Sequence, residues 1–203
     1  MKHDFILRLT DVRPLEEIRV EGNRQSPGAP LPIPLEAPHE NLVVDVRDAE
    51  QVLKAVEGMD SIMNLSVLRH DPDLAFEVNT LGAYNVMKAA VAHNIRRVVH
   101  TGPQYVALHN ENDYTWDYDV AGDIPPRPGA YLYGHSKYLT QEICRVFAEF
   151  YGIEVPVLLY SQFVSPKEEK HLYYFAVTWD DSGRALQCAL KMKDMPSYYE
   201  LCE

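Results

Sequence analysis

The chain has 203 residues, of which 46% are hydrophobic and 24% charged, a balance typical of one globular domain with a substantial core. Its formal net charge of -11 at pH 7 disfavours binding to nucleic acid, and no apolar run approaches the roughly 20 residues of a membrane-spanning helix. The three cysteines fit neither a disulfide framework nor a zinc site, so we expect a cytoplasmic protein that binds no nucleic acid, membrane or metal ion.

Short apolar runs alternate with longer amphipathic segments, which is the pattern of parallel strands joined by crossover helices. No repeat or change of composition marks a second domain, so residues 1–203 are expected to form one α/β domain. In chain order, the sequence predicts a strand over 5–9, a Pro-, Gly- and Ser-rich loop over 21–39, a strand over 41–44, a helix over 49–57, a strand over 61–65, a helix over 74–93, a strand over 96–100, a long loop over 102–130, a helix over 131–151, a strand over 155–160 and a helix over 182–191.

Tyr133 and Lys137 are four residues apart near the start of a predicted helix, so both side chains lie on one helical face. A phenol is a poor base at neutral pH, but a nearby ammonium favours the phenolate and brings it toward useful acid/base strength. The same spacing also arises by chance on exposed helix faces. Its position after the fourth predicted strand and the long loop favours a catalytic pair in a nucleotide-binding sheet.

Several segments, taken in order, resemble motifs of the extended short-chain dehydrogenase/reductases, the NAD-dependent epimerase/dehydratase family. The wording of 7–11 and 81–85 looks closest to the uronate dehydrogenase branch. The resemblance covers about residues 5–199 and implies a Rossmann-type doubly wound parallel sheet with NAD as cofactor. The segments that resemble family motifs are 44–48, 58–66, 79–86, 125–137 and 177–181.

The resemblance implies a role for each residue that matches a family motif. Tyr133 would be the general acid/base, Lys137 would hold the nicotinamide ribose and tune the tyrosine, and Thr101 would supply a hydroxyl to the substrate. The implied cofactor contacts are Asp11 at the adenosine ribose, Asp45 and Val46 at the adenine, Leu65 and Ser66 at the middle of the cofactor, Asn79 holding helix and strand around it, and Tyr133 with Lys137.

The acidic residue at the end of the first predicted strand bears on the choice between NAD and NADP. The charge of Asp11 would repel a 2'-phosphate and favours NAD, whereas the neighbouring Arg13 could accommodate that phosphate. Structural interpretations also stay open. Asp11 and Asp45 can cap turns, Asn79 can be a locally satisfied buried amide, and Thr101 can bond to its own backbone.

Two features depart from the family pattern. The ten glycines contain no G-x-x-G-x-x-G turn, and the chain is expected to begin inside the first family helix, N-terminally truncated by the first strand and its phosphate-binding loop. In the doubly wound order 3-2-1-4-5-6, that strand lies between the first and third strands predicted here. At the catalytic hydroxyl, the serine usual in the family falls in register on Gly102, next to Thr101.

Two hypotheses of function follow. The chain is an oxidoreductase of epimerase, dehydratase or dehydrogenase type, which moves hydride between NAD and a sugar, sugar acid or sugar nucleotide. Alternatively, it is a catalytically silent fragment similar to the short-chain dehydrogenases, or a binding or assembly protein. The family also leads us to expect a homodimer through the helices 74–93 and 131–151, and a small substrate lobe to which residues after about 164 contribute.

Overall fold

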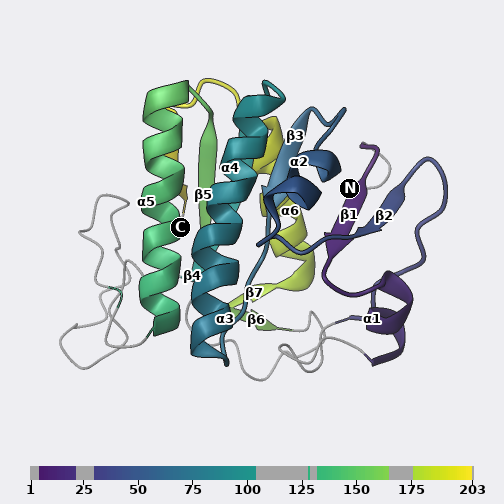
Figure 1. The fold of residues 1–203 in the computed structure, drawn as a ribbon. Coiled ribbons are helices and arrows are strands. Elements are labelled where there is room, and N and C mark those ends of the chain that lie inside the picture. The colour runs from purple at the N-terminus through teal and green to yellow at the C-terminus, as the bar shows by residue number, and fades with distance from the viewer. Residues whose placement is uncertain (1–4, 22–29, 104–127, 129–131, 165–175, 203) are drawn as a thin grey trace.

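Strands and helices alternate along the computed structural model, which describes residues 5–21, 30–103, 128, 132–164 and 176–202 (Figure 1). This alternation confirms the predicted α/β class. The first elements are β1 (Arg8–Asp11), α1 (Leu15–Glu21), β2 (Glu40–Val43), α2 (Ala49–Ala55), β3 (Ser61–Asn64), α3 (Pro72–Phe76), the π-helical turn η1 (Glu77–Leu81) and α4 (Gly82–Ala92). They are followed by β4 (Arg97–Pro103), α5 (Leu132–Tyr151), β5 (Val155–Tyr160), β6 (Gln162–Val164), β7 (Ala176–Thr178), α6 (Trp179–Lys191) and β8 (Tyr199–Cys202).

The central sheet is parallel and has the strand order β3-β4-β5-β8. Two further parallel sheets consist of β1 with β2 and of β6 with β7. The register places Asn64 of β3 beside His100 of β4, and His100 beside Val157 of β5. Because parallel strands run in one direction, the residues after β3 emerge at the same edge as the end of β4, where open α/β sheets bind ligands.

The core lies on both faces of the central sheet. α4 and α5 pack side by side on one face and α6 packs on the other (Figure 1). Along β4, Val98 belongs to the core beneath α4 and α5, while Val99 belongs to the core beneath α6, as the alternation of a strand requires. A strand buried on both faces is a continuous apolar run in the sequence, which is why this strand was predictable.

The β1–β2 pair is joined to the rest of the fold through Arg8. The Arg8 guanidinium donates to Glu40 at 2.6 Å and to the carbonyl oxygens of Ala55 and Glu57 at 2.9 and 2.8 Å, at the end of α2. Among the described residues, β1 and β3 each pair with a strand on one side only. The break between them lies where the doubly wound order has its first strand; the truncation itself stays a prediction.

Some predicted boundaries were wrong. The first strand begins at Arg8 rather than at residue 5, β4 runs three residues past 100, and α6 begins at Trp179 rather than at 182, because Thr178 caps it by accepting from the Asp181 amide. The predicted helix 74–93 begins at Pro72 behind the N-cap Asp71 and contains η1. Helix α1 and strand β8 were not predicted, since both are short and their polar residues hide the period.

Residues after 164 do not stand apart from the sheet in the part that is described. α6 packs on β4 and β5, and β8 extends the central sheet beside β5. The substrate lobe stays a prediction, and residues 104–127 of the long loop lie outside the described residues. Within the described ranges, no helix meets the length and apolarity needed to cross a membrane, and no three His, Cys, Asp or Glu side chains group as metal ligands.

Candidate active site

The inner face of α5 carries the Tyr133 and Lys137 pair. Tyr133 is 7% exposed and Lys137 is 2% exposed, so both are buried, as their spacing of four residues in a helix allows. Gly134 lies between them, and the Pro128 carbonyl oxygen occupies the space that a Cβ at 134 would need. The sequence therefore needs glycine here to bring residue 128 against the first turn of α5.

Lys137 joins α5 to the segment that follows β3. Its Nζ donates to the Ser66 carbonyl oxygen at 2.8 Å, across 71 residues of sequence. Burial lowers the pKa of Lys137 from 10.5 to about 8, and the charge of Arg69 acts in the same direction. The amine is still mostly an ammonium at neutral pH. An ammonium has three donors, and the described part of the chain accepts one of them, which leaves two for a ligand.

Arg69 places a second cation beside the tyrosine. Its guanidinium carbon lies 5.8 Å from the centroid of the Tyr133 ring, within range of a cation–π contact. Arg69 comes from the irregular segment between β3 and α3, which also supplies Ser66. Sequence reasoning missed this residue, because an arginine in a segment without period carries no signal of its own.

Asn79 holds the segment after β3 against α5. Its Nδ2 donates to the Leu68 carbonyl oxygen at 3.0 Å and to Ser136 Oγ at 2.9 Å, and its Oδ1 accepts from the Leu68 amide at 3.2 Å. Thr140 Oγ1 donates to the Asn79 carbonyl oxygen at 2.6 Å. Asn79 is 1% exposed and lies in the π-helical turn, a feature that is frequent at functional sites. These contacts satisfy the Asn79 amide locally, and its role around a cofactor stays a prediction.

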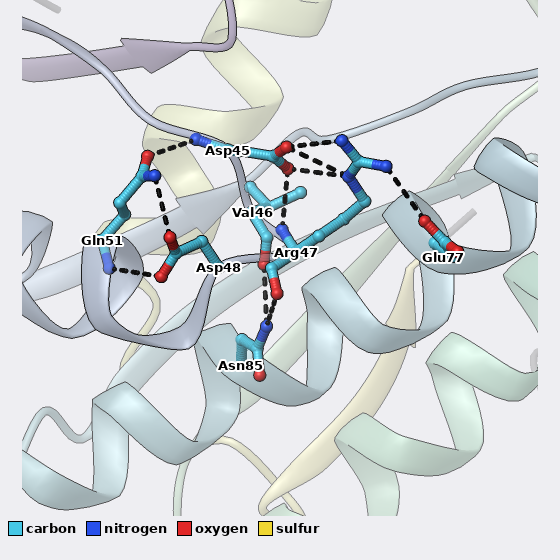
Figure 2. A network of polar contacts seen from close by, with 7 residues as sticks. All are labelled: Asp45, Val46, Arg47, Asp48, Gln51, Glu77 and Asn85. Atoms are coloured by element: carbon cyan, nitrogen blue, oxygen red, sulfur yellow. Dashed lines mark hydrogen bonds and ion pairs between the residues drawn. The ribbon is translucent and has the colours of Figure 1, made fainter.

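A second cluster surrounds Asp45 at the end of β2 (Figure 2). Asp45 Oδ1 accepts from the Arg47 amide at 3.0 Å, and Asp45 Oδ2 accepts from Arg47 Nη2 at 2.7 Å. Hydrogen bonds from Arg47 lower the pKa of Asp45, so the carboxylate is ionised at neutral pH. Asn85 Nδ2 donates to the carbonyl oxygens of Val46 and Arg47, and a Cβ at Gly82 would come within 2.7 Å of Val46 Cγ2. The turn after β2 is therefore fixed from α4.

A model of the NAD dependent epimerase/dehydratase family matches residues 15–177, which is more than half of the chain. The chain belongs to this family. The family that the sequence motifs predicted is therefore confirmed.

Curated relatives of this epimerase/dehydratase family member include enzymes named for sugars and sugar acids. It is 34% identical over 128 residues to L-arabinose 1-dehydrogenase (NAD(P)(+)) of Haloferax volcanii, covering 57% of this chain and 50% of the relative. It is 29% identical over 162 residues to uronate dehydrogenase of Pseudomonas syringae pv. tomato, covering 77% of this chain and 56% of the relative. The chain thus spans about half the length of the curated relatives it matches.

A solved structure shows the same fold. A mutant of uronate dehydrogenase from Agrobacterium tumefaciens, complexed with NAD, has a TM-score of 0.75 to this family member at 22% identity. The match covers 97% of this chain and 66% of that chain. The Rossmann-like parallel α/β fold is therefore confirmed.

Six of the nine predicted site residues belong to the cluster around Lys137 or to the cluster around Asp45, and the other three lie outside both clusters. Lys137, Ser66, Asn79 and Tyr133 come together between α5 and the segment after β3, while Asp45 and Val46 share the turn after β2. Three others have these surroundings: Asp11 is exposed and its Oδ1 accepts from the Arg13 amide at 2.9 Å, Leu65 is 48% exposed, and Thr101 Oγ1 donates to the Asn64 carbonyl oxygen at 3.4 Å.

Position 102, next to Thr101, is a glycine and therefore offers no side chain to a substrate. A Cβ at 102 would lie 3.0 Å from Gln141 Nε2 and 3.1 Å from Leu159 Cδ2. Gln141 therefore fills part of the space that a serine at this position would use. Both nitrogens of the His100 ring and Gln141 Nε2 are buried without a hydrogen-bond partner in the part of the chain that the structure describes.

Proposed function

We propose that this chain is the cofactor-binding part of an NAD-dependent oxidoreductase that acts on a sugar or sugar acid. The observation that carries the proposal is the buried 2.8 Å hydrogen bond from Lys137 to the Ser66 carbonyl, with Tyr133 one turn away on the same face. It supports a site where the acid/base helix meets the ligand-binding edge of the sheet. The names of the relatives, an arabinose dehydrogenase and a uronate dehydrogenase, favour oxidation of an aldose or a uronate.

The described residues fit NAD at three places. The ionised carboxylate of Asp45, in a turn fixed from α4, suits the adenine, and the two remaining donors of Lys137 suit ribose hydroxyls. Asp11 is exposed at the end of β1, where its carboxylate can accept from the adenosine ribose. Since its charge disfavours a 2'-phosphate, NAD is the proposed cofactor rather than NADP.

The chemistry assigned to the protein is proton transfer. NAD, when bound, supplies the hydride acceptor or donor. Tyr133 would act as the phenolate and take the proton of a substrate hydroxyl at its oxygen, and the positive charges of Lys137 and Arg69 would stabilise the negative charge that this oxygen carries before the transfer. Thr101 would offer its hydroxyl to the substrate. Its present bond to the Asn64 carbonyl is long at 3.4 Å, so a substrate oxygen can replace that carbonyl.

Cofactor binding and turnover test the proposal separately. We expect the chain to bind NAD more tightly than NADP in isothermal titration calorimetry, and to form NADH with L-arabinose or a uronate. Tyr133→Phe should retain NAD binding and lose turnover, because it removes only the hydroxyl. A Tyr133→Phe variant with wild-type turnover would refute the role of the phenol.

The second candidate, a catalytically silent protein, is favoured by Gly102 and by the break between β1 and β3. It predicts no heat with millimolar NAD and no NADH with any sugar substrate. Absence of NAD binding would therefore decide for this candidate. The cytoplasmic location and the lack of a nucleic-acid partner stay predictions.

We also propose a homodimer through the outer faces of α4 and α5. Apolar side chains there are exposed in the single chain, as Tyr84 at 42%, Val146 at 51% and Phe150 at 79% show. Light scattering should give twice the mass of one chain, and Val146→Glu should halve it because a charge is costly at a buried interface. A wild-type mass of one chain would contradict the dimer.

A further inference from the structure

The turn between β2 and α2 is held by more side chains than a turn needs. The Asp45 amide donates to Gln51 Oε1 at 3.0 Å, and Asp48 caps α2 by accepting from the amides of residues 50 and 51. Asn85 holds two carbonyl groups of the turn from α4. Arg47 adds a link to η1, which makes three helices that fix residues 45–48 (Figure 2).

Arg47 is the centre of this arrangement. Its Nε lies 3.0 Å from each oxygen of Asp45, its Nη2 lies 2.7 Å from Asp45 Oδ2, and its Nη1 lies 3.0 Å from Glu77 Oε2. The planar guanidinium thus donates hydrogen bonds to Asp45 on one side and to Glu77 on the other, which fixes the plane of the Asp45 carboxylate. Lysine could not do this, because an ammonium is a point charge without a fixed fork.

The exposure of these side chains argues against a role in stability alone. The side chains of Asp45, Arg47 and Glu77 are 26%, 35% and 51% exposed, and ion pairs this open to water contribute little to stability. Their effect is therefore positional: they decide where the Asp45 oxygens point.

The Asp45 carboxylate stays open to a donor from outside the protein. Arg47 supplies it with three N–H groups, from its amide, Nε and Nη2, and the Nε hydrogen is shared between the two oxygens of a group that has about four acceptor sites. The side chain is 26% exposed, so an outside donor can still reach it. The exocyclic amine of adenine is such a donor, whereas the carbonyl oxygen that replaces it in hypoxanthine would face the carboxylate with no hydrogen to share.

We propose that Arg47, anchored by Glu77, is a positioning residue that orients the Asp45 carboxylate to recognise the amine of the NAD adenine. This inference rests on the proposed function, because it assumes that NAD binds at this turn. It goes further in assigning base selectivity to Arg47 and Glu77, two residues that need not touch the cofactor.

The test compares the affinity for NAD with that for nicotinamide hypoxanthine dinucleotide, by calorimetry or by NMR titration into the millimolar range. The wild type should prefer NAD by about tenfold or more, the size expected of a hydrogen bond to a charged group. Arg47→Met and Arg47→Lys should reduce that preference to about twofold, since neither retains the fork. Glu77→Gln should reduce it in part.

Arg145 offers a matched control. It also bridges two carboxylates, Glu142 at 2.8 Å and Glu149 at 2.7 Å, on the exposed side of α5. Arg145→Met should therefore keep the wild-type preference. Should Arg47→Met fail to fold, Glu77→Gln tests the same link from its other end.

The outcomes separate the two proposals. If Arg47→Met lowers the affinities for both ligands equally and leaves the preference unchanged, the role of Arg47 is merely structural and the inference is overturned. Binding of both ligands by the wild type without preference would also overturn it, while leaving the proposed function standing. Binding of neither ligand by the wild type would overturn the proposed function, and this inference with it.

Discussion

Replacing Lys137 by Met removes a buried amine whose pKa is lowered by burial from 10.5 to about 8. In the unfolded chain the amine titrates near its usual value, so between about pH 8 and 10.5 the unfolded state holds more protons than the folded state. The contribution of Lys137 to the stability of the wild type therefore rises with pH across this window. Below it, the cost of burying the charge is fully present; at about 1.36 kcal/mol per pH unit it amounts to about 3 kcal/mol.

The quantity to measure is the free energy of unfolding in urea, at pH values that span this window, for wild type and Lys137→Met. Taking the difference between the two proteins cancels the tyrosines and other groups that they share. The difference should shift by about 3 kcal/mol in favour of the wild type as pH rises, whatever constant offset the lost bond to Ser66 adds. Lys88→Met, at an exposed position of α4, should give a flat difference. A flat difference for Lys137→Met would refute the reasoning.

Three further substitutions have expected outcomes in urea denaturation. His100→Phe should raise stability by about 1 kcal/mol, because both ring nitrogens are buried without a partner among the described residues. It should also remove a loss of stability below pH 6.5, since burial lowers the pKa of His100 and the unfolded chain then binds the extra proton. Arg97→Met should lower the free energy of unfolding by about 2 kcal/mol, because it removes hydrogen bonds to Glu154 and to three carbonyl groups at the end of α6. Arg184→Met, at an exposed position, should lower it by less than about 0.5 kcal/mol. Gly102→Ser should lower the free energy of unfolding by about 1 kcal/mol, and adding Gln141→Ala should recover part of that loss by freeing the space. A Gly102→Ser loss that is the same with Gln141 present and with Gln141→Ala would count against the contact.

The sequence predicted the elements whose periods are strong. β4 and β5 are continuous apolar runs, and α5 has a buried stripe at helical spacing, so their existence and direction followed directly. It did not predict α1, which has seven residues of mixed polarity; among residues 15–20, whose burial is described, only Leu15 is buried. Nor did it predict η1, which lies inside the predicted helix 74–93.

The site was predictable where it follows local motifs. The spacing of Tyr133 and Lys137 placed both on the buried face of α5, and the motif around Asn79 placed that amide beside them. Contacts between distant segments were not predictable, because no local pattern encodes them. The bond from Lys137 to the Ser66 carbonyl, the position of Arg69 over the tyrosine and the grip of Arg47 on Glu77 all belong to this class.

The β1–β2 pair has little apolar cover of its own, since Leu9 is 39% exposed and Val43 is 55% exposed, and Arg8 ties it to the end of α2. Such a unit opens locally at low free energy, whereas β4 and β5 release their amide hydrogens only when the whole protein unfolds. If the adenosine end of a cofactor contacts the β1–β2 pair and its nicotinamide end lies beside α5, the bound cofactor connects a part of the protein that opens easily to a part that does not. Protection against hydrogen exchange would then be gained first in β1 and β2, far from the atoms that react.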